Sequence, residues 1–257
     1  MDAFDYEADD DCCDELFDLP SFCKVEKFYV RKKAKDKNLT EDTVAYLKPA
    51  TFYENVKYII VSATANEDVY YKYFGENKVD FYVCKKAAYG GVLEQYPERS
   101  MSRTYISEHP GIIERLMKCF KIYDEDKVIT FLKFKGGVLH FGNTEGSNML
   151  EGQDILVVGT PYHAEFIYKL AAFEMGLVFD DDEAMSLQFV EYNGKRFWLN
   201  TFRDEDLRSI QFWMLESELE QAVGRARLLR NSCKVYLFSS FVLSQATVVK
   251  GFDYGEE

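Results

Sequence analysis

The residues best suited to chemistry lie in one short segment near the end of the chain, at 221–227, with the sequence QAVGRAR. An arginine guanidinium is a planar, always-charged fork, which matches negative charge spread over phosphoryl oxygens. A glycine beside such arginines lets the backbone approach a ligand closely. The candidates are Gln221, Gly224, Arg225 and Arg227. The alternative is an ordinary helix on which Arg225, Arg227 and Arg230 are solvated along one face.

A second candidate segment is TEGSN, at 144–148, which precedes the apolar run DILVVG at 154–159. Thr144, Gly146 and Asn148 offer a hydroxyl, a flexible backbone and an amide side chain within five residues. Groups of this kind can hydrogen-bond to phosphate or to a nucleotide. The alternative is a Gly/Asn turn that only joins two strands.

A third candidate segment is Ser62-Ala-Thr64, which ends the run VKYIIVSA at 56–63. The run is rich in β-branched and aromatic residues, which predicts a strand buried on both faces, as in a parallel sheet. Short hydroxyl side chains at the carboxyl end of such a strand lie at the edge of an α/β cleft. The alternative is that Ser62 and Thr64 only form a turn.

Together these segments resemble conserved motifs of the superfamily-two helicases. Ser62–Thr64 resembles motif III, 144–148 with the run to Pro161 resembles motif V, and 221–227 resembles motif VI. They occur in the order III, V, VI, and the arrangement is nearest to that of the XPD-like helicases. The resemblance covers roughly residues 56–243 and implies a C-terminal, RecA-like helicase domain.

The resemblance also implies a role for each candidate. The catalytic residues would be the arginines that reach the γ-phosphate of ATP, held with Mg²⁺ by another RecA-like domain: Arg225 and Arg227. The nucleotide-binding residues would be Gln221, Gly224, Gly146 and Asn148. The residues that contact single-stranded nucleic acid would be Thr144, Ser62 and Thr64. No residue of this chain is expected to form a metal site of its own.

Two positions depart from the family's pattern. Asn148 stands where Asp is more usual, which keeps a hydrogen-bonding group but removes a charge. The second arginine usually follows the first by three residues, but position 228 is leucine, so either Arg227 or Arg230 would take this role. Arg230 adjoins Asn231 at the expected helix end, where a cation can simply complement the helix dipole, and this favours Arg227.

The phosphate-binding half of an ATPase is missing from the sequence. It contains no Gly-x-x-x-x-Gly-Lys-Ser/Thr loop and no full Asp-Glu-x-Asp box. Residues 1–5, MDAFD, either are a remnant of that box with Ala3 in place of the catalytic Glu or belong to an acidic tail. We therefore expect the second motor domain of an ATP-dependent helicase or translocase, inactive without a P-loop domain in cis or trans. The alternative is a non-catalytic binding or regulatory module with the same half-fold.

Apolar runs alternate with helical patterns along the chain, which predicts βα units and a mostly parallel sheet. Strands are expected at 56–63, 79–84, 103–106, 128–134, 138–141, 154–159 and 233–239. Helices are expected at 111–120 and 163–175, and a long helix or a helix pair at 204–229. Asn193-Gly194, between two aromatic runs, predicts a β-hairpin near 187–199. The expected fold is α/β: a RecA-like, mostly parallel sheet with helices on both faces and an inserted β-hairpin.

Negative charge is concentrated at the N-terminus. The net charge is −13, yet residues 1–20 hold nine acids and no base, and the remainder holds 31 bases against 35 acids. We therefore divide the chain into 1–55, an acidic segment with a remnant of a first motor domain, and 56–257, the C-terminal domain. A nearly balanced body offers few phosphate contacts, so we expect the chain alone to bind single strands weakly.

Cysteine spacing and hydropathy exclude several further classes of protein. The six cysteines form no Cys-x-x-Cys pair, which argues against zinc and iron–sulfur sites. No apolar run approaches ~18 residues, the length that a membrane-spanning helix needs. The N-terminus is acidic where a signal peptide would be basic, so we expect a cytoplasmic protein without a membrane partner.

Overall fold

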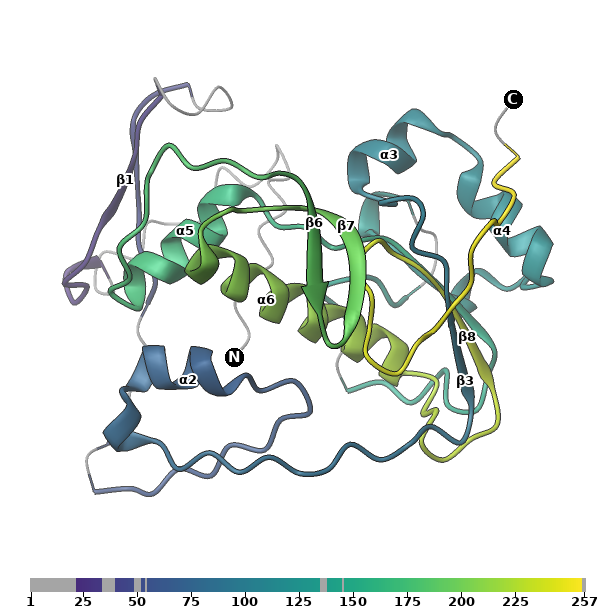
Figure 1. The fold of residues 1–257 in the computed structure, drawn as a ribbon, viewed down its shortest axis with the longest axis horizontal. Helices are drawn as coiled ribbons and strands as arrows, with labels where there is room; N and C mark the ends of the chain where they lie inside the picture. Colours follow the sequence, from purple (N-terminus) through teal and green to yellow (C-terminus); the bar gives the residue numbers. More distant parts are fainter. Residues whose placement is uncertain are drawn as a thin grey trace.

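A five-stranded parallel sheet forms the centre of the computed structural model (Figure 1). The structure describes residues 22–33, 40–48, 52–53, 55–134, 138–144 and 146–255. The strand order is β4-β5-β8-β3-β9. The strands are β3 (Val92–Gln95), β4 (Val128–Ile129), β5 (Ile155–Val158), β8 (Lys234–Phe238) and β9 (Thr247–Val248). The predicted α/β fold is confirmed, and β5 and β8 lie within the predicted strands 154–159 and 233–239.

Strands β5 and β8 pair in parallel at the middle of the sheet, and Val157 lies opposite Leu237. All four residues of β5 are fully buried, which requires cover on both faces. A run of β-branched and leucine residues without polar alternation suits such a strand. This pair is the most deeply buried part of the core.

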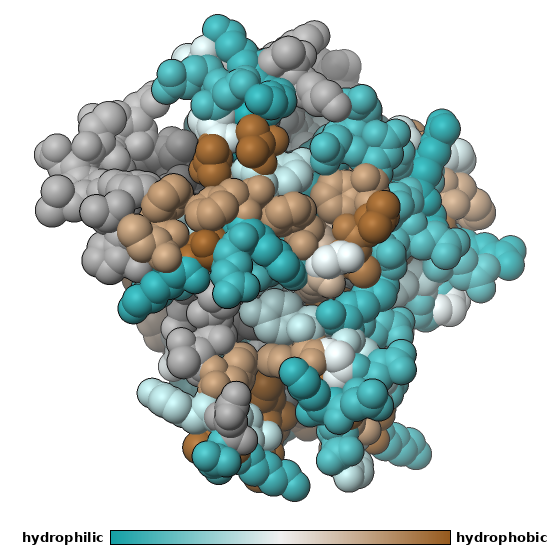
Figure 2. Space-filling model, turned by 90° about the vertical axis from the view of Figure 1, so that its left-hand side faces the viewer, coloured by the Kyte–Doolittle hydropathy of each residue, from teal (hydrophilic) through white to brown (hydrophobic). Residues whose placement is uncertain are grey.

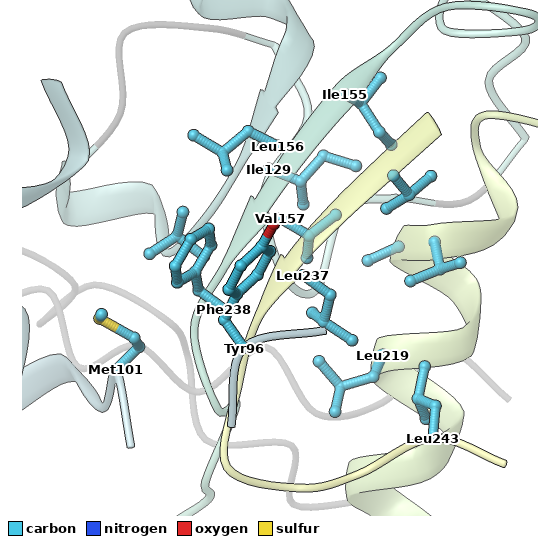
Figure 3. Packing of buried hydrophobic residues seen from close by; sticks show 14 of the residues in the cluster. Tyr96, Met101, Ile129, Ile155, Leu156, Val157, Leu219, Leu237, Phe238 and Leu243 are labelled. Atoms are coloured by element: carbon cyan, nitrogen blue, oxygen red, sulfur yellow. The ribbon is translucent and has the colours of Figure 1, made fainter. Parts of the chain in front are cut away.

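Helices cover both faces of the sheet, as predicted. Successive residues of β8 point to opposite faces, so Phe238 and Leu237 contact different layers. The ring of Phe120, in α4 (Ile112–Phe120), lies 5.7 Å from that of Phe238, whereas Leu219, in α6 (Glu205–Gly224), lies on the side of Leu237 (Figure 3). A further helix, α5 (Glu165–Glu174), packs against α6.

The predicted β-hairpin is confirmed as β6 (Ser186–Tyr192) and β7 (Lys195–Thr201). Asn193 and Gly194 adopt φ angles of 51° and 70°, the left-handed pair that a tight hairpin turn requires. The residues of one hairpin face, such as Val190 and Leu199, are buried against the core. The opposite face is exposed to solvent.

Two predicted strands, 56–63 and 79–84, are wrong as strands. Both segments are extended but unpaired, and they flank α2 (Glu67–Phe74) and a 3₁₀ turn (Glu76–Lys78). Val61 is 92% exposed, and Ile59 and Tyr82 are also exposed. Figure 2, which looks at the side with β1 and α2, shows apolar side chains at the surface among hydrophilic ones. The composition suits a buried strand, but no described strand lies beside either segment to form a ladder.

Three further strand predictions need correction. Residues 103–106 lie in α3 (Arg103–Glu108), because Ser102 caps a helix by accepting a hydrogen bond from the Tyr105 N–H. The run 128–134 is a strand only in β4 and then forms a 3₁₀ turn (Leu132–Phe134). The run 138–141 has only a bridge between His140 and Asn143.

A small antiparallel pair, β1 (Tyr29–Arg31) and β2 (Thr43–Ala45), lies beside α5. The Arg31 guanidinium lies 3.6 Å from the Phe166 ring centroid, and Lys27 Nζ donates to the Glu174 carbonyl at 2.8 Å. Residues 1–5, with the box-like sequence, lie outside the described residues. Within the described part of the chain, no helix is both long and apolar enough to cross a bilayer.

The contrast between buried and exposed valines gives a direct test of this fold. Val157→Ala should lower the free energy of unfolding by about 2 kcal/mol, because Val157 is fully buried. Val61→Ala should change it by less than about 0.5 kcal/mol, because Val61 is almost fully exposed. Urea denaturation of both variants measures this, and equal losses would show that 56–62 is buried in solution.

Candidate functional site: an arginine loop at the amino edge of the sheet

The structure brings two of the three candidate segments together. Arg225 follows the last residue of α6, and its Nη1 donates to the Ser147 carbonyl at 3.1 Å. Arg227 Nη2 donates to Asn148 Oδ1 at 2.7 Å. Residues 78 and 79 positions apart in the sequence are thereby joined. Residues 225–231 are called the arginine loop below.

The arginine loop lies at the amino edge of the sheet. It leads into β8, and 146–153 lead into the adjacent strand β5. The Gly152 N–H donates to the Ala226 carbonyl at 3.1 Å, and Asn231 Nδ2 donates to the Arg227 carbonyl at 3.2 Å. The parallel pairing of the two strands therefore determines which loops meet.

Arg227 has a backbone conformation that L-residues rarely adopt, with a φ of 55°. Such a conformation costs on the order of 1 kcal/mol and persists only where the surroundings impose it. Asn231 and the loop at 146–148 supply these constraints through the bonds described above. Arg230, the other candidate for the second arginine, is exposed and forms no side-chain hydrogen bond to a described residue. The geometry thus brings Arg227, rather than Arg230, into the cluster.

Two glycines that the sequence analysis did not select hold the arginine loop in place. The N–H groups of Gly90 and Gly91 both donate to the Leu228 carbonyl, at 2.8 and 2.9 Å. A Cβ atom on Gly91 would lie 2.4 Å from the Cys233 carbonyl oxygen and 2.7 Å from that of Asn231. Only glycine fits so close to the backbone. In the sequence, this role could have been inferred from the adjacent glycines, which directly precede the apolar residues Val92 and Leu93 of β3.

The remaining nucleotide candidates surround the arginine loop. The Gln221 carbonyl accepts a bond from Arg225 Nε at 3.2 Å. Gly224 and Gly146 both border open space, and Gly146 has a φ of 69° that favours glycine. The Thr144 side chain is only 1% exposed, so its hydroxyl does not face solvent in this conformation. Among the described residues, no three potential metal ligands lie together.

Ser62 and Thr64 lie away from the arginine loop. Trp213 Nε1 donates to the Thr64 carbonyl at 3.0 Å, and Trp213 precedes Arg225 by twelve positions along α6. A helix rises 1.5 Å per residue, so the two positions are about 18 Å apart. Ser62 Oγ accepts from the Thr64 N–H at 3.2 Å, which is the turn geometry named as the alternative.

The segment that leads to Gly90 is tied to the last turns of α6. The Tyr89 hydroxyl donates to Glu220 at 3.1 Å, and Lys86 Nζ lies 3.8 Å from the same carboxyl group. Burial raises the pKa of Glu220, and Lys86 opposes that shift. These contacts support the backbone that carries Gly90 and Gly91.

Paired glycine substitutions test this arrangement. Gly91→Ala should destabilise the protein by about 2 kcal/mol, because the new Cβ overlaps two carbonyl oxygens. Gly224→Ala is the matched control: it meets open space at a helix end and should raise stability by up to about 1 kcal/mol. Thermal melts of both variants measure the difference. A neutral Gly91→Ala would mean that the loop is not held against β3.

No protein-family model, no curated protein and no solved structure matches this chain. The arrangement of its own residues must therefore support any functional assignment.

Proposed function

We propose that this chain is the second motor domain of a superfamily-two helicase or translocase. It would supply Arg225 and Arg227 to an ATP site, with Mg²⁺, that a P-loop domain in cis or trans completes. The observation that carries the proposal is the docking of the arginine loop on 146–148 by hydrogen bonds from both guanidinium groups. A free helix with solvated arginines would not require this contact.

The arrangement suits phosphoryl transfer because both arginines are held before a ligand arrives. Preorganised charges stabilise a transition state without reorganisation at the moment of reaction. A guanidinium has five N–H donors, and Arg227 uses one of them on Asn148, so it can also donate to phosphate oxygens. A Cβ atom added at Gly224 or Gly146 would meet no other atom within 4 Å, so no side chain covers these two positions. Gln221 and Asn148 would add polar contacts to it.

Nucleic acid would be contacted elsewhere on the domain. Ser62 is exposed and Thr64 partly so, and both can present hydroxyl groups to a single strand. Thr144 is buried, so a contact through its hydroxyl would need a local rearrangement of 144–148. With few cations in these segments, binding by the chain alone would be weak and sensitive to salt.

A second candidate function is a non-catalytic binding or regulatory module with the same half-fold. Its specific support is that the arginines are already bonded to the chain's own loop while the sequence lacks a phosphate loop. In that case the two arginines would only hold the loop before β8 against the loop before β5. Their effect on turnover separates the two functions.

Arginine substitutions in the chain combined with a P-loop motor domain test the catalytic role. Arg225→Ala and Arg227→Gly should each lower ATP turnover by ~10²-fold or more with little change in nucleotide affinity, because finger arginines act on transition-state charge. Glycine at 227 accepts the positive φ, so folding is preserved. Arg230→Ala is the control and should be nearly silent. Full turnover by both folded variants would exclude the proposal.

The chain by itself should show no ATPase activity above background, with or without single-stranded nucleic acid. The reason is the absent phosphate loop, without which no lysine and backbone nest holds the β- and γ-phosphates. Phosphate release at high protein concentration measures this. Turnover that copurifies with the chain and disappears in Arg225→Ala would show that a complete site exists within it.

A further inference from the structure

A cavity lies at the carboxyl edge of the sheet, opposite the arginine loop. Its volume is about 590 Å³, within the range of ligand sites. Residues that follow β3, β5 and β8 form its floor, among them Pro97, Thr160 and Ser240. The crevice outside the carboxyl ends of parallel strands is the usual place for ligands in α/β proteins. No candidate residue from the sequence analysis lines it.

The exposed face of the β-hairpin forms the far wall. Leu187 and Phe189 of β6 lie opposite Asn200 and Trp198 of β7 in the strand register, so all four share that face. Trp198 is 59% exposed, and its ring centroid lies 5.4 Å from that of Phe189. Of these, Leu187, Trp198 and Asn200 line the cavity. Leu187, Phe189 and Trp198 are therefore exposed apolar side chains on one face, and exposed apolar patches often mark binding sites.

A cation, Arg103, also lines the cavity. The Arg103 guanidinium stacks 4.5 Å from the Phe131 ring centroid, and its Nη1 donates to the Tyr162 carbonyl at 2.8 Å. These contacts hold the group in place and use one N–H, so other donors remain available for an anion. The hydroxyl-bearing residues Ser102 and Thr104 lie beside it in the cavity wall. Arginine with neighbouring hydroxyl groups suits a phosphate.

The lining also contains one carboxylate, Glu98, whose oxygens accept hydrogen bonds from the Gly251 and Phe252 N–H groups, and several neutral polar groups. His163 lines the cavity, and burial, with Arg103 nearby, lowers its pKa to about 4, so the imidazole is uncharged at neutral pH. The Asn200 side-chain amide also lines the cavity, and no hydrogen bond to it occurs within the described residues. An amide and a neutral imidazole can each donate and accept, which matches the edge of a nucleobase.

We propose that this cavity binds a nucleotide unit, with the base stacked on Trp198 and the phosphate held by Arg103. Aromatic stacking plus a cation is the combination that single-strand binding sites use. The unit belongs either to a free nucleotide or to a single strand, and the chemistry that recognises it is the same. The assignment does not depend on the proposed ATP site, because β5 and β8 separate the two edges by roughly 16 Å.

Tryptophan fluorescence can test the site in the full chain. The chain has two tryptophans, so the Trp213→Phe variant leaves Trp198 as the only reporter. It would be titrated with a ~16-residue oligothymidylate and, separately, with thymidine monophosphate, after a thermal melt shows that it is folded. Either ligand should quench Trp198. Quenching by the oligonucleotide alone identifies a strand as the source, and equal quenching per nucleotide identifies a free nucleotide.

Affinity measurements on variants test the stacking on Trp198 and the phosphate contact of Arg103 separately. With a labelled form of whichever ligand quenches, Trp198→Ala should weaken binding by about 5- to 100-fold, and Trp198→Phe should restore part of it. Arg103→Ala should weaken binding and, for a strand, lower its dependence on log salt concentration by about one. Tyr123→Ala, at another exposed aromatic residue, should change neither value. Absence of quenching, or binding that is unaffected by both Trp198→Ala and Arg103→Ala, would overturn the proposal.

Discussion

The parallel pairing of β5 with β8 is the interaction on which the rest of the structure depends. Val157 faces Leu237 in this pair, and both residues are fully buried. The register fixes the loops at both ends of the two strands. At the amino edge it brings the arginine loop against 146–148, and at the carboxyl edge it brings Thr160 beside Ser240, with 3.3 Å between their hydroxyl oxygens. Both candidate sites therefore depend on the buried pairing of β5 with β8.

The amino-edge site is built from backbone as much as from side chains. Gly90 and Gly91 bond to the Leu228 carbonyl, and Asn231 bonds to that of Arg227, so the loop is restrained on both sides of its left-handed residue. The side-chain hydrogen bonds of Arg225 and Arg227 therefore mainly orient the two guanidinium groups. This division explains why removing a guanidinium is expected to affect turnover more than folding, whereas crowding Gly91 affects folding.

Local patterns predicted the hairpin turn, two of the buried strands and three of the helices. The Asn193-Gly194 turn, the buried strands at 155–158 and 234–238, and the helices α4, α5 and α6 follow from turn chemistry and apolar periodicity. Helix α6 ends at Gly224, however, so residues 225–229 of the predicted helix belong to the arginine loop. Strand β3 was not predicted because half of it is polar. Its Gln95 is buried only because its amide donates to the Ser239 and Phe241 carbonyls, contacts that no local pattern reveals.

The wrong strand predictions and the missed contacts also arise because they depend on residues far apart in the sequence. Residues 56–63 have the composition of a buried strand, but a strand forms only when a neighbour accepts its backbone hydrogen bonds. Likewise, the sequence indicated the arginines and the segment 144–148 separately, and no local pattern reveals their contact, which joins residues 78 positions apart. The cavity beside Trp198 was missed because its lining comes from three strand ends and the hairpin.

The central claim is that the arginine loop is docked on the loop at 146–148, and a double-mutant cycle between Arg227 and Asn148 tests it most directly. The side chains are 2.7 Å apart. Unfolding free energies of Arg227→Ala, Asn148→Ala and the double variant would be compared, so that the backbone cost of alanine at 227 cancels. The account predicts a favourable coupling of about 0.5–1.5 kcal/mol. A coupling indistinguishable from zero in folded variants would contradict it.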